Sequence, residues 1–425
     1  MSDDLEPTGI DPAIIRGLSA RRVTRRSLLA GAGSLGAAAL VSACGGVSGV
    51  SKKSKVSNGA VQSYWSKQHK TPGFVFASWP LYIDVNPHNR SDHPSLDRFT
   101  RMTGMKVKYE EVIQDDDSFI GKIEPILKVG QSTGYDLVIL ENGPLYIGRL
   151  MDAGWLVPLD HSKLPNFAKY AAAKVKNPSY DPGNKYTVAW QSGFTGIGYN
   201  PKLTGREITS FEDLFDPKFK GKVGMLADIM ELPSFALNGM GYDSETATEA
   251  DWKKARDKLM QQKNAGMVRK YYEQDYIQDL SRGNTWLSMA WSGDIFQANA
   301  SGAKDLKFVI PKEGGNIWTD NLAIPKGAAN AFDAITYMNY VYEPRAAAIM
   351  AEGINYITPV PSCRSYVRSD AAKAKGSARQ TLEYIADNPL VFPTADEYAH
   401  THHFPNLTSA QIPVWENMFE PIYQS

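Results

Sequence analysis

Trp318 and Asp320 lie two positions apart within residues 314–325, an apolar stretch that is typical of a buried strand. On an extended strand the two side chains would share one face, which places an aromatic ring beside a carboxylate. A carboxylate in apolar surroundings needs a partner, and an organic cation can contact both the ring face and the acid. The alternative is an ordinary core, in which Asp320 pairs with an arginine or with backbone amides.

Two further groups of residues repeat this chemistry. Trp291 precedes Asp294 by three positions, and the two could bind a cation or serve as a core residue and a helix cap. Asp228 and Glu231 are also three apart, at the expected start of a helix, where acids favour the positive end of the helix dipole. Aromatic walls that alternate with carboxylates suit a ligand whose ammonium groups are separated by apolar links.

The segments that must position these residues alternate between strands and helices from residue 73 onward. Strands are expected at 74–79, 105–112, 135–140 and 221–226, with an extended Gly-rich segment at 193–200; helices are expected at 94–102, 118–129, 145–153, 211–215 and about 249–262. Strands separated by helices predict parallel βαβ units. Ligands bind at the carboxyl ends of such strands, so Trp79 and Tyr82 should lie on the same rim as Glu141.

The composition is that of a globular protein without an excess of either charge. The 425 residues include 46 Lys and Arg, 46 Asp and Glu, and 43% hydrophobic residues. A chain of this length can bury two domain-sized cores. Nothing indicates a nucleic-acid partner, which would require a basic excess, so any recognition by charge must be local.

Residues 1–43 are expected to be an export signal rather than part of the fold. Residues 24–29 form a twin-arginine pattern, and a weakly apolar Gly/Ala run then leads to Cys44, in an order that resembles a bacterial lipoprotein signal. A membrane-spanning helix is the alternative, but about 20 predominantly apolar residues, richer in Leu and Ile, would be needed. Lipid on Cys44 would make residues 44–72 a lipidated flexible tether and leave Cys363 without a disulfide partner. Export by the twin-arginine route would place the protein on the outer face of the cytoplasmic membrane or in the periplasmic space.

Four stretches resemble the spermidine/putrescine-binding proteins of bacterial ABC importers, and the resemblance covers about residues 74–423. The stretches are 311–325, 135–138, 213–221 and 352–359, of which the first is the most specific. The resemblance implies an α/β, two-lobed periplasmic-binding-protein fold (type II) with a ligand cleft between the lobes. In that family, aromatic residues stack on the methylene chain and carboxylates hold the amines. The positions carried over are Trp79, Tyr82, Asp228, Glu231, Trp291, Trp318, Asp320 and Tyr356.

The chain departs from the family pattern at two places. Pro80 and Leu81 stand where the family has a small hydroxyl residue and an acid. Glu141 stands where serine or threonine is common, and we infer that it replaces the missing acid. Asp294 completes a set of five candidate acids, more than a diamine needs, so spermidine is expected to bind more tightly than putrescine.

The resemblance also predicts the organisation and partners of the protein. Lobe 1 is expected to comprise residues 73–190 and 322–362, and lobe 2 residues 191–321 and 363–425. A polyamine-binding protein delivers its ligand by lobe closure to an ABC permease and its ATPase. We expect a monomer that is not an enzyme, touches the membrane only through its lipid, and has no cofactor and no metal in its site.

Several alternatives stay open. An enzyme could use Asp228 and Glu231 as acid and base, but the mature chain has no Gly-x-Ser-x-Gly elbow, phosphate loop or zincin motif. A carrier of the same fold could bind ferric ion through Tyr271 and Tyr272, or another small organic cation or a sugar between its aromatic walls.

A histidine cluster offers one more alternative. His400, His402 and His403 could ligate a metal such as zinc. A polar cluster near the C-terminus is more often a solvated loop.

Overall fold

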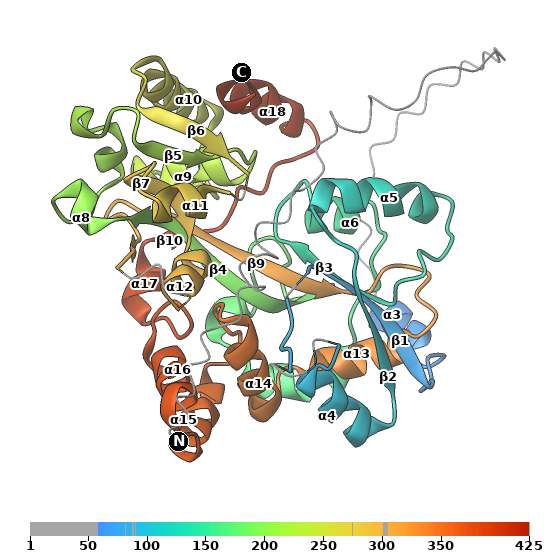
Figure 1. Ribbon diagram of the computed structural model, residues 1–425. Coiled ribbons are helices and arrows are strands. Elements are labelled where there is room, and N and C mark those ends of the chain that lie inside the picture. Colours follow the sequence, from blue (N-terminus) through green and yellow to red (C-terminus); the bar gives the residue numbers. More distant parts are fainter. Residues whose placement is uncertain are drawn as a thin grey trace, which may run out of the picture.

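The computed structural model shows an α/β protein (Figure 1), as the sequence predicts, and describes residues 58–80, 82–86, 89, 91–273, 275–300 and 305–424. The twin-arginine pattern and Cys44 lie outside these residues. The strands are β1 (Gly73–Ser78), β2 (Lys106–Glu111), β3 (Leu137–Glu141), β4 (Thr187–Tyr199), β5 (Val223–Leu226), β6 (Val268–Tyr272), β7 (Leu287–Trp291), β8 (Lys307–Val309), β9 (Gly315–Ala323) and β10 (Thr401–His402).

The helices follow the expected alternation with the strands. They are α3 (Asn58–Trp65), α4 (Pro94–Thr103), α5 (Asp116–Lys128), α6 (Ile147–Asp152), α7 (Pro165–Tyr170), α8 (Pro201–Thr204), α9 (Glu231–Gly239), α10 (Glu249–Asn264), α11 (Tyr276–Ser281), α12 (Ser292–Ala300), α13 (Ala331–Tyr340), α14 (Pro344–Ile354), α15 (Arg364–Lys373), α16 (Gly376–Asp387), α17 (Ala395–Ala399) and α18 (Ile412–Tyr423). Short 3₁₀ turns are η1 (His161–Lys163), η2 (Ala173–Val175), η3 (Phe211–Phe215), η4 (Pro217–Phe219) and η5 (Pro361–Cys363). The helix predicted at 211–215 is thus a 3₁₀ turn. Among the described residues, no helix is both long and apolar enough to cross a membrane.

One mixed sheet connects the two halves of the molecule. Its order is β2-β1-β3-β9-β4-β7-β5-β6, with β10 beside β9 and β8 beside β4. β1 runs parallel to β2 and β3, and β5 runs parallel to β6 and β7, which confirms the predicted parallel units. β9 is antiparallel to β3 and β4, and β4 is antiparallel to β7. Figure 1 shows the two long strands, β4 and β9, crossing the middle of the molecule.

The crossing strands are buried along their whole length, as central strands covered on both faces must be. β4 begins at residue 187, six residues before the expected Gly-rich segment, and contains a register shift between Ala189 and Gln191. A third segment joins them through a bridge between Ser192 and Ile357, whose backbone groups exchange hydrogen bonds of 3.0 and 2.9 Å. The middle of the molecule therefore contains three extended segments that are far apart in sequence.

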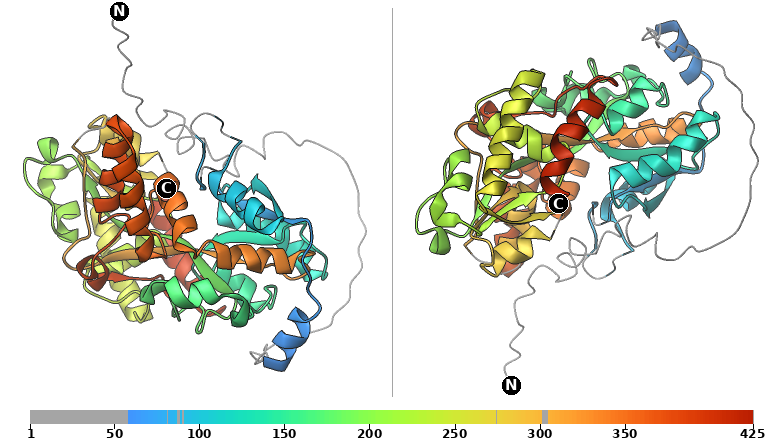
Figure 2. Two further views of the ribbon diagram at one scale, coloured as in Figure 1. Left: turned by 90° about the horizontal axis from the view of Figure 1, so that it is seen from below. Right: turned by 90° about the horizontal axis from the view of Figure 1, so that it is seen from above.

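Two large cores lie on either side of these strands. One joins β1 and β3 to α4, α13 and α14, and the other joins β5 and β7 to α9, α10 and α18. The buried residues Val367 and Ile385, of α15 and α16, belong to the first core. α15 and α16 lie at the opposite side of the molecule from α18 (Figure 2).

The prediction of a flexible tether over residues 44–72 is wrong for the last part of this range. Residues 58–65 form helix α3, and Trp65 is only 2% exposed. The Trp65 Nε1 donates a hydrogen bond of 2.8 Å to the carbonyl of Pro158, which attaches this segment to the folded body. A large apolar ring that can be buried overrides the polar, Gly-rich character of its neighbours.

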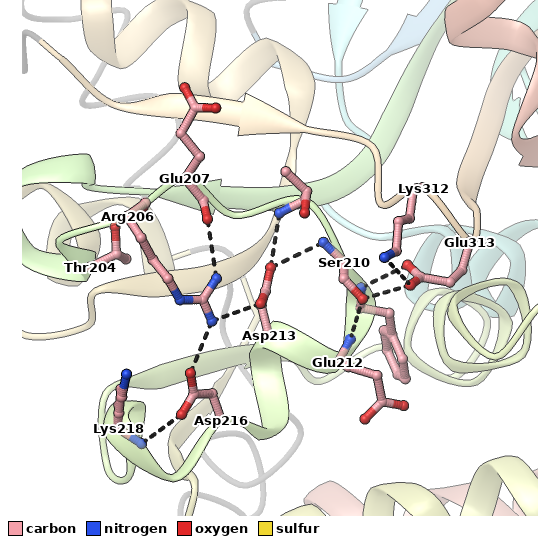
Figure 3. Close-up of polar contacts among 12 residues, drawn as sticks. Thr204, Arg206, Glu207, Ser210, Glu212, Asp213, Asp216, Lys218, Lys312 and Glu313 are labelled. Atoms are coloured by element: carbon pink, nitrogen blue, oxygen red, sulfur yellow. Dashed lines mark hydrogen bonds and ion pairs between the residues drawn. The ribbon is translucent and has the colours of Figure 1, made fainter.

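A polar network fastens residues 206–216 to the start of β9 (Figure 3). Arg206 forms ion pairs with Asp213 at 2.7 Å and with Asp216 at 2.9 Å. The Ser210 hydroxyl donates a hydrogen bond of 2.6 Å to Glu313, two residues before β9. Asp213 and Asp216, from the 213–221 stretch, therefore help to hold this loop against the segment that leads into β9.

Candidate ligand-binding site

Asn316, Trp318 and Asp320 alternate along β9 and so share one face of the sheet. The partner of Trp318 on β4 is Gly193. A Cβ atom at position 193 would lie 2.2 Å from the Trp318 ring, so only glycine leaves room for this indole. The expected pairing of a ring and a carboxylate on one face is present.

Tyr356 extends the aromatic wall that Trp318 begins. Its ring packs edge-on against Trp318, with centroids 5.4 Å apart, and against Tyr82, with centroids 5.9 Å apart. A Cβ atom at position 293 would lie 2.3 Å from the Tyr356 ring, so Gly293 admits this side chain as Gly193 admits Trp318. Three distant segments of sequence thus converge.

Asp320 lies at the end of this wall. The Tyr82 hydroxyl donates a hydrogen bond of 2.6 Å to its carboxylate. Burial raises the pKa of Asp320 to about 7, although the hydrogen bond from Tyr82 opposes the shift. The core alternative, with an arginine or backbone amides as partner, does not describe this carboxylate, because its hydrogen-bond partner is a neutral phenol.

Glu141 ends β3 and lies directly opposite Asp320 in the antiparallel register. Burial raises the pKa of the Glu141 carboxyl well above its usual range, and the charges of Glu231, Asp228 and Asp320 raise it further. The rim position predicted from the strand order therefore brings this acid to the same group of side chains.

Glu231 is held by three side-chain hydrogen bonds. It accepts hydrogen bonds from Trp291 Nε1 and Thr195 Oγ1, both at 2.8 Å, and from Asn316 Nδ2 at 2.7 Å. Burial and the charge of Asp228 raise its pKa to about 7, while these hydrogen bonds lower it. Asp228 accepts the backbone N–H groups of residues 230 and 231 at 2.8 Å and so fixes the backbone that leads into α9, whose N-cap position is occupied by Met230.

Asp294 lies in the first turn of α12, as the helix-cap alternative suggested, and faces two tyrosines. Tyr276 Oη donates a hydrogen bond of 2.7 Å to it, and Tyr356 Oη lies at 3.5 Å. Burial raises the pKa of Asp294 to about 6 against the effect of these bonds. Tyr276 also accepts the backbone N–H of Trp291 at 2.9 Å and so holds this segment in place.

The remaining aromatic residues pack around the same cluster. Trp79 and Trp291 are partly buried against the hydrophobic cluster that contains Trp318, and Tyr356 packs there too. Trp79 directly follows β1, and its carbonyl accepts a hydrogen bond of 3.2 Å from the hydroxyl of Tyr109 on β2.

The arrangement is suited to a cation with several charged groups. Among the described residues, no lysine or arginine forms an ion pair with Glu141, Glu231, Asp294 or Asp320. These carboxyls and the aromatic rings lie around one location. Each acid would gain from a positive charge that the protein itself does not supply.

Several supporting residues of the site were not predicted from the sequence. Asn316 could have been found from its spacing, because it lies two positions before Trp318 on the same strand face. Thr195 and Tyr276 carry no local signal, since only the tertiary fold brings them to Glu231 and Asp294. Of the tyrosines suggested for ferric ion, Tyr272 donates its hydroxyl to Asp279 at 2.6 Å within the second core, which gives no support to that alternative.

Residues 95–379 match a family described as bacterial extracellular solute-binding protein. The spermidine/putrescine-binding periplasmic protein of Salmonella typhimurium is 31% identical over 301 residues, which cover 71% of this chain and 81% of that protein. A putrescine-binding periplasmic protein of Pseudomonas aeruginosa is 30% identical over 346 residues, covering 76% and 87%.

Solved structures give the same result for the fold. The substrate-binding protein of a spermidine/putrescine ABC transporter from Streptococcus pneumoniae superposes with a TM-score of 0.67 at 22% sequence identity. The superposition covers 83% of this chain and 98% of that chain.

Proposed function

The chain belongs to the bacterial extracellular solute-binding protein family and has its two-lobed fold, and from this premise we propose that it binds a polyamine and delivers it to an ABC importer. It is a solute-binding protein of a transport system and not an enzyme. Polyamines carry ammonium groups on an apolar chain, which is the chemistry that the candidate site complements.

The observation that carries the proposal is the set of buried acids around the Trp318 and Tyr356 rings. Asp320 and Asp294 accept hydrogen bonds from tyrosines, and Glu231 accepts them from an indole, a hydroxyl and an amide. These donors are all neutral. An ammonium group would supply the missing charge, and a charge-assisted hydrogen bond is stronger than a neutral one.

We assign the ligand contacts by grouping the acids: Glu141 with its cross-strand partner Asp320, and Asp228 with Glu231, three residues further along the chain. Asp320 and Glu141 receive one terminal ammonium group, and Asp228 and Glu231 receive the other. Asp294 receives a middle amine. The aromatic surfaces along the methylene chain come from Trp79, Tyr82, Trp291, Trp318 and Tyr356. Where one of these rings contacts an ammonium group, the cation–π contact contributes about 0.5–2 kcal/mol.

Lobe closure is the proposed means of capture. The lobes predicted from the sequence are 73–190 with 322–362 and 191–321 with 363–425. Because Val367 and Ile385 pack in the first core, we assign α15 and α16 to lobe 1 instead of lobe 2. The three extended segments in the middle would serve as the hinge. Small-angle scattering with and without spermidine should show compaction, and an identical profile at saturation would count against closure.

Export and anchoring complete the proposal. A twin-arginine signal would be cleaved before Cys44, and lipid on this cysteine would hold a monomer at the outer face of the cytoplasmic membrane, beside a permease and its ATPase. Fractionation of cells tests the anchor. The wild-type protein should sediment with membranes and Cys44→Ser should not, and an equal distribution of both would reject lipidation.

Native mass spectrometry of the protein purified from cells tests the ligand class without assuming it. We expect a bound species whose mass equals that of a polyamine and which is lost on unfolding. A retained sugar or ferric ion would instead support one of the other carriers of this fold.

A further inference from the structure

A second polar group lies in the loop between α9 and α10 and on β10, outside the polyamine site. Asp243, Glu245 and His402 each offer one ligand atom, and these atoms all lie within 4.8 Å of one another. Glu245 also lines a cavity of about 230 Å³ together with Ile317 and Thr319. These two residues alternate with Trp318 and Asp320 on β9, so the cavity lies on the opposite face of the strand.

The spacing of two of these atoms suits a metal ion. His402 Nδ1 lies 3.1 Å from Asp243 Oδ1. Two ligands bound to one tetrahedral zinc ion at about 2.0–2.2 Å lie roughly 3.3 Å apart. A divalent ion could therefore be bound by both atoms with little movement of either side chain. Both side chains are partly exposed, which leaves access for the ion and room for a water ligand.

The backbone around these side chains is fixed without any ion. Ser244, which is fully buried, donates from its amide to Asn238 at 3.0 Å and from its hydroxyl to the carbonyl of His403 at 2.7 Å. The His403 amide donates to Glu245 at 3.2 Å. β10 itself is held by pairing with β9, where His402 lies opposite Asn316. The two ligand-bearing segments therefore form one unit, so that an ion would not have to order them.

We propose that Asp243, Glu245 and His402 form a binding site for a divalent transition-metal ion, with zinc as the best match. Imidazole nitrogens and carboxylate oxygens are both ligands of zinc, whereas calcium and magnesium prefer oxygen ligands alone. The ion would cross-link the connection after α9 to β10 and stabilise the folded state by mass action. This metal is separate from the polyamine site, for which no metal is expected.

The test is a titration of the whole, untagged protein with zinc chloride, without polyamine or chelator. Calorimetry should show one saturable site, and zinc should raise the melting temperature. His402→Gln and Asp243→Asn should each weaken zinc binding at least tenfold. His69→Gln, at an exposed histidine elsewhere in the chain, should bind zinc as the wild type does.

Circular dichroism and spermidine affinity verify that each variant is folded, and if one variant fails to fold the other decides. Magnesium in excess should not displace the zinc. The proposal is overturned if the wild-type protein shows no saturable zinc binding. It is equally overturned if folded His402→Gln and Asp243→Asn bind zinc with unchanged affinity.

Discussion

Glu141 at the end of β3 lies directly opposite Asp320 on β9, so a partly buried and a buried carboxyl are neighbours across the sheet. The pKa of Asp320 is raised to about 7 by burial, and that of Glu141 is raised by burial and by the charges of Glu231, Asp228 and Asp320. Adjacent negative charges oppose each other's ionisation. An ammonium group beside both would remove that penalty, which makes the pair a strong candidate for the end of a polyamine site.

Asp320→Asn should weaken spermidine binding more than tenfold, about 1.4 kcal/mol, because an amide of the same shape lacks the charge that the ammonium group needs. The melting temperature should stay the same or rise, since the buried charge is itself costly. Calorimetry and a melting curve measure both quantities. Asp257→Asn, at an acid whose side chain is 67% exposed, is the matched control and should change neither. Normal affinity in Asp320→Asn would return this acid to a structural role.

Spermidine affinity should increase as the pH rises from about 5.5 to 8, because the pKa values of Asp320 and Glu231 are about 7 and that of Asp294 is about 6. Each value is raised by burial. The ligand binds the ionised acids, so binding should release protons. Titration in buffers with different ionisation enthalpies measures the number released, and pH-independent binding without proton release would contradict this account.

The same pKa shifts predict the stability of the ligand-free protein. In the unfolded chain these acids ionise at about pH 4. Between about pH 4 and 7 the folded state therefore binds more protons than the unfolded state. The free energy of unfolding of the ligand-free protein should then fall as the pH rises through this window. Saturating spermidine should consequently raise the melting temperature more at high pH than at low pH.

Gly193→Ala should weaken spermidine binding, because the new methyl group would lie 2.2 Å from the Trp318 ring and must displace it. A several-fold loss is expected, measured by calorimetry on protein with an unchanged circular dichroism spectrum. Gly121→Ala is the matched control, since Gly121 lies in α5 and its added Cβ would meet nothing within 4 Å. Equal affinity of both variants with the wild type would show that the position of the Trp318 ring does not matter.

Spermidine should bind more tightly than putrescine, because three ammonium groups can satisfy more of the five acids than two can. Asp294→Asn should reduce this preference by weakening spermidine binding more than putrescine binding, because Asp294 is assigned to the middle amine, which putrescine lacks. Competition titrations with spermidine, putrescine and spermine measure the order in both proteins. Tighter putrescine binding by the wild type would mean that some of these acids do not face the ligand.

The sequence predicted the local features of the fold well. The helix predicted at 94–102 is α4, which has Pro94 in its first turn and ends at Gly104 with a φ of 75°, a backbone conformation that favours glycine. The predicted strand pairing of β1 and β2 also follows from local alternation. The full length of β4 was missed, because its first residues are buried on both faces and show no alternation for a periodicity to detect.

The candidate site was partly predictable for the same reason. Trp318 and Asp320 are neighbours on one strand, so their spacing alone places them together. Tyr276 and Thr195 reach Asp294 and Glu231 only through tertiary contacts, which no sequence spacing encodes. The tether prediction failed at Trp65, since composition alone does not show that a single ring finds a place to be buried.

Isothermal titration of the wild-type protein with spermidine tests the central claim most directly. We expect one spermidine to bind per chain with a dissociation constant of about 1 μM or lower, which corresponds to a binding free energy of about 8 kcal/mol. The affinity should fall when the acids facing the wall are neutralised. A folded protein that gives no binding heat and no thermal stabilisation with spermidine, putrescine or spermine would contradict it.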